Sequence, residues 1–223
     1  ASLIRWLALG APGDDKVHLH EKGLRIKGAL VVSDGEADPV TSSTTPGLDL
    51  EDCTLPNSLA LLACRFQHAL ILRSAQVRSL NLHRSSFPAF IAPALKIKNE
   101  FFLHYAQSEG PVILQGASIG GDLYCEGMRL TNRNGDAIAA DGLRLQGAVV
   151  FKRIIADGEV RLQRAHIGAD LDCTDVQLYS CNGAALNADG SKIEGIIFLR
   201  NASAKGIVRL IGVRIGGNLV FRV

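Results

Sequence analysis

Large side chains are scarce in this chain. It has 8 Phe, 3 Tyr, 1 Trp and 1 Met among 223 residues, but 23 Gly, and small aliphatic residues make up most of the 47% that is apolar. This composition favours a core of many similar thin layers over one built on large rings. No apolar run approaches the roughly 18 residues that a membrane-spanning helix needs, so the composition argues against an integral membrane protein.

Cysteine is present but lacks the spacings that carry chemistry. The chain has 5 Cys at irregular intervals and no CxxC pair. This argues against a disulfide framework and against a zinc site, and it indicates a reducing compartment. We therefore expect a cytoplasmic protein.

An internal repeat dominates the sequence. Residues 110–157 and 158–205 align without a gap over 48 positions, of which 19 are identical, and a third copy begins at Gly206. Leu123, Leu171 and Leu219 thus recur at a spacing of 48 residues. Within a copy, apolar residues occur as pairs two apart, such as Val112 and Leu114, which is the alternation of short β-strands.

The step between these pairs predicts the fold. Most steps are 5 or 6 residues, which divides each 48-residue copy into eight short sides, or two coils of four sides. Strands this short cannot bury themselves alone, so successive coils must pair with one another. We predict an all-β fold, a right-handed β-helix with about 22–24 residues per coil.

The domain organisation follows from the limits of the repeat. Residues 1–16 are expected to form an N-terminal helix that caps the first coil, and residues 17–223 a single β-helix domain. Within it, the polar, acidic segment 33–46 predicts a loop. Because the third copy stops partway, we expect the chain to be a piece of a longer solenoid, and we expect end-to-end self-association through its open last coil.

Several sequence units resemble a known group of proteins. They are GASIGGDL at 116–123, AHIGADLDC at 165–173, Ala-Asp-Gly at 140–142 and 188–190, and IRWLALG at 4–10. The units resemble bacterial β-helical proteins that are often labelled membrane-associated oxidoreductases or uncharacterised, and that are similar in style to pentapeptide-repeat proteins. The resemblance implies peripheral association with the inner membrane and a redox label.

The residues themselves predict no catalytic centre. There is no strand-linked GxGxxG, no redox CxxC and no haem attachment motif, so we expect no cofactor and no metal. Asp122 and Asp170 recur two coils apart, at about 10 Å, which is too far for one calcium ion to bridge. They are interpreted as corner residues that accept hydrogen bonds. Cys125 and Cys173 are predicted to lie in the core, and Cys181 to project and react.

Charge is distributed unevenly along the chain. Residues 1–55 hold 9 acids and 5 bases, whereas residues 56–223 hold 13 acids and 19 bases, and no acid occurs between Asp52 and Glu100. That interval contains six candidate anion contacts: Arg65, Arg73, Arg78, Arg84, Lys96 and Lys98. Further along, Lys96, Arg144 and Lys192 recur at the repeat spacing and predict an outward ladder of bases.

These patterns favour a non-catalytic scaffold or binding module. Its expected partners are proteins or an anionic surface, either lipid headgroups or polysaccharide. Nucleic acid is not expected, and the acidic column that DNA mimicry needs is missing. The alternative is an enzyme, either carbohydrate-active or an oxidoreductase, and a cleft with converging acids and bases would favour it.

Overall fold

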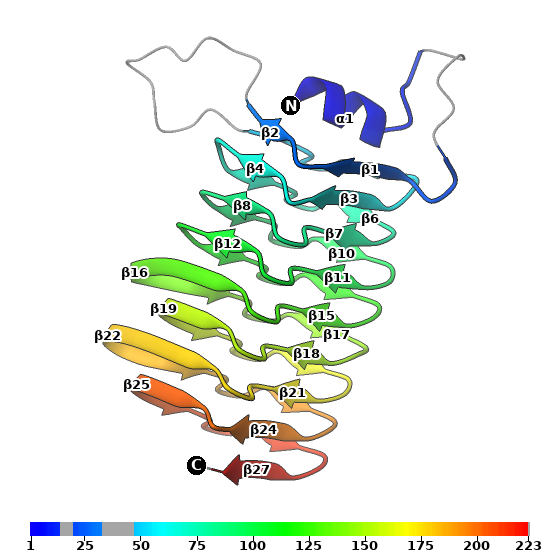
Figure 1. Ribbon diagram of the computed structural model, residues 1–223. Helices are drawn as coiled ribbons and strands as arrows, with labels where there is room; N and C mark the ends of the chain where they lie inside the picture. Colours follow the sequence, from blue (N-terminus) through cyan, green and yellow to red (C-terminus); the bar gives the residue numbers. More distant parts are fainter. Residues whose placement is uncertain (14–19, 33–46, 223) are drawn as a thin grey trace.

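The computed structural model describes residues 1–13, 20–32 and 47–222. It confirms the all-β class: parallel strands stack into a β-solenoid of about seven turns, with one short helix at the amino end (Figure 1). The strands of sheet A run leftward across the front of Figure 1 while the chain descends from coil to coil, which is a right-handed path. The loop predicted at 33–46 lies outside the residues that the structure describes.

Three parallel sheets run along the solenoid. Sheet A comprises β1 (Leu24–Lys27), β3 (Leu59–Leu62), β7 (Leu80–Asn81), β11 (Phe101–Phe102), β15 (Leu123–Tyr124), β18 (Val149–Val150), β21 (Leu171–Asp172), β24 (Ile197–Arg200) and β27 (Leu219–Arg222). Sheet C comprises β6 (Gln76–Val77), β10 (Lys96–Ile97), β14 (Ser118–Ile119), β17 (Arg144–Leu145), β20 (His166–Ile167), β23 (Lys192–Ile193) and β26 (Arg214–Ile215).

Sheet B covers two sides of the coil. Its members are β2 (Leu30–Val31), β4 (Arg65–Phe66), β8 (Ser86–Phe87), β12 (Gln107–Ser108), β5 (Leu70–Ile71), β9 (Phe90–Ile91), β13 (Val112–Ile113), β16 (Arg129–Ala139), β19 (Ile155–Arg161), β22 (Gln177–Asn187) and β25 (Ser203–Arg209). The long strand β16 pairs with β12 near its start and with β13 near its end, so it joins the two sides. With sheets A and C, this gives the four-sided coil that the repeat predicted.

Coil length changes along the solenoid. The inward residues of sheet A from Leu59 to Leu219 follow one another at steps of 21, 21, 22, 26, 22, 26 and 22 residues. The 48-residue repeat is thus a 22-residue coil plus a 26-residue coil, around the predicted average. The extra residues lie in β16 and β22, whose register shifts make a ridge on one edge of the solenoid (left in Figure 1).

The corner beneath the ridge explains one recurring glycine. Gly158 is buried with φ 137°, and a Cβ there would lie 2.5 Å from the carbonyl oxygen of Asn132. A residue without a side chain is needed at this position because the bulged backbone of β16 passes directly over it. Gly206 repeats the conformation two coils later, with φ 138°.

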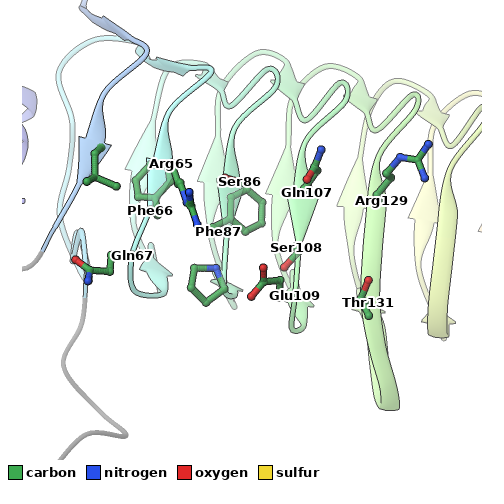
Figure 2. A pocket seen from close by; sticks show the side chains of 12 residues that line it. Arg65, Phe66, Gln67, Ser86, Phe87, Gln107, Ser108, Glu109, Arg129 and Thr131 are labelled. Carbon is green, nitrogen blue, oxygen red and sulfur yellow. The ribbon is translucent and has the colours of Figure 1, made fainter. Parts of the chain in front are cut away.

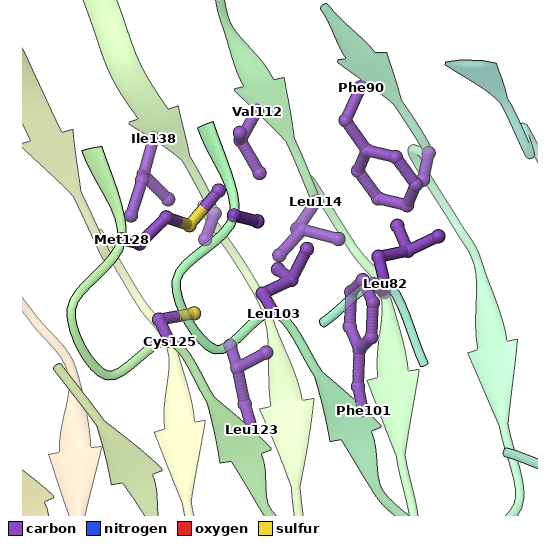
Figure 3. Close-up of a cluster of buried hydrophobic side chains, with 14 of the residues drawn as sticks. Leu82, Phe90, Phe101, Leu103, Val112, Leu114, Leu123, Cys125, Met128 and Ile138 are labelled. Carbon is purple, nitrogen blue, oxygen red and sulfur yellow. The ribbon is translucent and has the colours of Figure 1, made fainter. Parts of the chain in front are cut away.

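The core is a continuous stack of inward side chains. Phe90 lies 5.6 Å from Phe101 between ring centres, and leucines continue the stack toward Cys125 and Met128 (Figure 3). Cys125 and Cys173 are each 1% exposed, which confirms their predicted core positions. Burial raises the pKa of the Cys125 thiol well above its usual range and that of Cys173 to about 12. Both thiols therefore behave as small apolar groups.

The two ends of the described solenoid differ. Helix α1 (Ser2–Ala8) turns Ile4 and Ala8 into the core, and the Arg5 guanidinium donates a hydrogen bond of 2.6 Å to the Asp49 carbonyl. This confirms a short helix against the first coils. At the other end, Leu219 lies in register with buried Ile197 but is 49% exposed, because β27 has no strand on its far side.

Candidate anion-binding face

Sheet C presents a line of basic side chains to solvent. Its outward residues are in register from strand to strand: Gln76, Lys96, Ser118, Arg144, His166, Lys192 and Arg214. Two residues after the first two members come Arg78 and Lys98, on the same face. We call Arg78, Lys96, Lys98, Arg144, Lys192 and Arg214 the basic strip. From Lys96 to Arg214 it crosses five strand spacings, or about 24 Å at about 4.8 Å each.

Most of the basic strip is not neutralised by the protein itself. Within the described residues, Arg78, Lys96, Lys98, Arg144 and Arg214 have no ion pair or side-chain hydrogen bond, and all are exposed. Lys192 pairs with Glu194 at 2.5 Å, and the hydrogen bond from Lys192 lowers the pKa of that carboxyl. Glu21 and Lys22 share a neighbouring hollow with Arg78 and Lys98, and their charges offset each other, so the exposed bases of the basic strip still leave a positive potential over the face.

A shallow hollow of about 460 Å³ lies at the amino-terminal part of the basic strip. Arg78, Lys96 and Lys98 line it together with Gln76 and Ser118. Three positive charges and two neutral hydrogen-bonding groups converge there, which is the chemistry that holds a phosphate or carboxylate.

The structure divides the six predicted anion contacts among several places. Arg78, Lys96 and Lys98 come together on sheet C. Arg65 lies on sheet B, Arg73 sits at a corner 3.4 Å from Glu51, and the Arg84 guanidinium lies 5.9 Å from the Tyr105 ring centre. The six therefore do not form one patch. The absence of acids in their stretch of sequence says nothing about which side of the coil each one faces.

The register adds a base that the sequence analysis missed. Arg214 pairs with Lys192 and extends the basic strip, although it belongs to the row of Ser118 and His166 rather than to that of Lys96. The signal was available in the repeat, since residues 118, 166 and 214 are 48 apart. The sequence analysis followed residues 96, 144 and 192, but on sheet C these alternate with residues 118, 166 and 214, so both series form a single column.

Other recurring bases are paired with recurring acids. Arg161 donates to Asp141 at 2.6 Å, and Arg209 donates to Asp189 at 2.5 Å, one repeat later. Asp122 and Asp170 each accept a backbone N–H from the following coil at 2.7 Å, from Ala148 and Ile196 respectively. These acids hold corners together, as interpreted from the sequence, and they offset the bases beside them.

A second hollow lies on sheet B, with a volume of about 590 Å³. Two rows of side chains cross it (Figure 2): Arg65, Ser86, Gln107 and Arg129 in one, and Gln67, Glu109 and Thr131 in the other. Glu109 is the single carboxylate among the residues that line this hollow. Two acids converging in one cleft, which would favour an enzyme, are therefore not found in it.

An aromatic cluster covers part of sheet A. Phe102 and Tyr124 stack with ring centres 5.2 Å apart, and His104 lies 5.2 Å from Tyr124. Burial, followed by the neighbouring His83, lowers the pKa of His104, while the hydrogen bond from the Tyr124 hydroxyl to Asp122 raises the pKa of Tyr124 to about 12. Because Phe102 and Tyr124 cover each other's faces, this cluster serves packing between coils.

Metal-binding and membrane-spanning features are also lacking in the described part of the chain. Residues 1–13, 20–32 and 47–222 contain no group of three or more His, Cys, Asp or Glu side chains placed to hold a metal ion. None of the helices described there has the length and apolar character needed to span a membrane.

Comparison with known proteins identifies no relative: no protein-family model, curated protein or solved structure matches this chain. What the structure establishes is a β-helical repeat protein.

Proposed function

We propose that this chain is a non-catalytic scaffold module that docks reversibly on an anionic lipid surface through the basic strip of sheet C. The observation that carries the proposal is the set of five exposed bases without an ion pair, gathered on the outer face of sheet C. Clusters of four to eight Lys and Arg residues are typical of proteins that bind anionic headgroups. The hollow among Arg78, Lys96 and Lys98 is large enough to receive one such headgroup.

The shape of the face supports a membrane as the partner. The strands of sheet C are two residues long and in register, so their outward side chains form one column along the sheet. The outward column of sheet C from Gln76 to Arg214 holds no aliphatic residue and no Phe, Tyr or Trp, so the face has nothing to insert into the acyl region. The imidazole of His166 is the single ring in this column, and a row of rings on which successive nucleobases could stack is missing, which argues against single-stranded nucleic acid.

The expected binding strength is modest. Each base near an anionic membrane contributes about 1 kcal/mol, so six bases less the one acid give about 5 kcal/mol. Binding of this strength is peripheral and reversible, and it weakens when salt shortens the Debye length from about 10 Å to about 3 Å. It agrees with the membrane-associated label of the β-helical proteins that the repeat units resemble.

Vesicle sedimentation tests the proposal. We expect the protein to pellet with vesicles of phosphatidylcholine containing 30% phosphatidylserine at low salt, but not with pure phosphatidylcholine and not at 1 M NaCl. The variant Arg78→Glu/Lys96→Glu/Lys98→Glu should stay in the supernatant. The matched control is Arg65→Glu/Arg129→Glu/Lys205→Glu, which makes the same charge change on sheet B and should still pellet.

Three results would contradict the proposal. They are no pelleting of the wild type at low salt, equal loss in both triple variants, and binding to a soluble polyanion that greatly exceeds binding to vesicles and is lost in Arg78→Glu/Lys96→Glu/Lys98→Glu. The last would identify an anionic polymer as the partner of this face.

A further inference from the structure

The hollow on sheet B has the features of a ligand site separate from the basic strip. Arg65 on β4, Ser86 on β8, Gln107 on β12 and Arg129 on β16 are in register across four neighbouring strands. Their side chains form a straight row along the solenoid axis, with an arginine at each end (Figure 2). Three strand spacings of about 4.8 Å separate the two arginines, or about 14 Å.

Both arginines are free to bind a ligand. Within the described residues, neither Arg65 nor Arg129 has an ion pair or a side-chain hydrogen bond, and both are exposed. The fork-shaped guanidinium favours carboxylates, which it can hold through two parallel hydrogen bonds. A ligand that engages both must therefore carry two acidic groups about three coils apart.

The region between the arginines is rich in hydrogen-bonding groups and holds one carboxylate, that of Glu109 in the second row. Ser86 and Gln107 lie in the row of the arginines, and Gln67 and Thr131 lie beside it. A hydroxyl and an amide can each donate and accept, which suits the hydroxyl groups of a sugar. Phe66 and Phe87 also line the hollow but are only 3% and 2% exposed, so no ring is available for stacking a nucleobase.

We propose that this hollow binds a short segment of an acidic glycan that runs along the solenoid axis. The coil spacing of about 4.8 Å is close to the length of one pyranose unit in an extended glycan, so each coil would meet one sugar. Arg65 and Arg129 bind the carboxylates of the first and fourth units, and Ser86 and Gln107 bind hydroxyls between them. An added peptide strand is not favoured, because the backbone groups of β4, β8 and β12 are already paired with the neighbouring coils.

Titration calorimetry with unbranched 1,4-linked oligogalacturonates tests the proposal. The tetrasaccharide should bind at least about tenfold more tightly than the disaccharide, because only the longer chain reaches both arginines. A neutral tetrasaccharide of the same linkage should not bind measurably. In Arg65→Gln or Arg129→Gln, the affinity for the tetrasaccharide should fall about tenfold or more and no longer depend on chain length.

The control variant is Arg78→Gln/Lys98→Gln. It removes two positive charges from sheet C, as Arg65→Gln/Arg129→Gln does from sheet B, and it should leave tetrasaccharide binding unchanged while weakening vesicle binding. The glycan proposal fails if the tetrasaccharide does not bind the wild type at millimolar concentration, if the disaccharide binds equally well, or if the control loses as much affinity as the double arginine variant. The lipid proposal is judged by binding through the basic strip, to vesicles or to a polyanion, so either proposal can fail without the other.

Discussion

Adjacent positions on β18 offer a sharp test of the inward and outward assignment. Val149 is 0% exposed and pairs with Leu123 on one side and Leu171 on the other, both of them buried. Val150 is the next residue, half-buried on the outer surface between Tyr124 and Asp172. The same substitution, Val→Asp, can therefore be made at both positions with opposite expected consequences.

The magnitude follows from what each aspartate would meet. At position 149 the change removes a buried valine side chain, worth about 1.5–3 kcal/mol. It also places a carboxyl group with no partner in the core, at a further cost of about 3–5 kcal/mol. The sum of about 4.5–8 kcal/mol is a large part of the 5–15 kcal/mol that typically stabilises a domain. At position 150 the carboxylate stays in water, and the nearby Asp172 makes the expected loss about 1 kcal/mol.

Urea unfolding followed by circular dichroism measures the difference. Val149→Asp should unfold at a far lower urea concentration than the wild type, and Val150→Asp close to it. Burial raises the pKa of a carboxyl, so the defect of Val149→Asp should be smallest below the unfolded pKa of about 4 and should grow as the pH rises through the higher folded value. Equal midpoints for the two variants at pH 7 would show that the alternation across sheet A has been assigned wrongly.

Four further expectations follow from local features. Gly158→Ala should lose about 2 kcal/mol or more of unfolding free energy, because its Cβ would lie 2.5 Å from the Asn132 carbonyl oxygen. Gly142→Ala has open space at its Cβ and should lose only about 1–2 kcal/mol. Equal shifts of the melting temperature in the two variants would refute the steric explanation. Burial, and after it the charge of His83, lowers the pKa of His104 below its ordinary 6.5, so the stability due to the neutral imidazole is present above pH 6.5 and is lost as the pH falls through the folded value. The urea midpoint of His104→Asn should therefore change less between pH 7.5 and pH 5.5 than that of the wild type. An equal change in both proteins would count against this. Cys181 is exposed and should react with Ellman's reagent in the native protein, while Cys125 and Cys173 should react only after unfolding, so rapid labelling of either Cys125 or Cys173 would contradict its burial. The 223-residue chain should self-associate through its open edge, where Leu219 is 49% and Phe221 is 67% exposed; light scattering that shows a monomer across a dilution series would refute this, and Phe221→Lys should shift the equilibrium toward monomer.

The sequence by itself determined the architecture. The repeat of 48 residues and the apolar pairs two apart are properties of neighbouring residues, and only stacked coils satisfy both. The inward places of Leu123, Leu171, Cys125 and Cys173 followed from the same alternation, because side chains one residue apart in a strand face opposite ways.

Only the tertiary structure decided which charges share a face. Arg73 and Arg78 are five residues apart, yet Arg73 pairs with Glu51 at a corner and Arg78 belongs to the basic strip. Conversely, Lys96 and Arg214 lie on the same sheet although they are 118 positions apart in the sequence. The hollow of sheet B joins Arg65 and Arg129 in the same way. These groupings depend on how many residues each corner takes up and on which base finds an acid in the next coil. Both are set by contacts between coils, so the sequence of a single coil does not contain them.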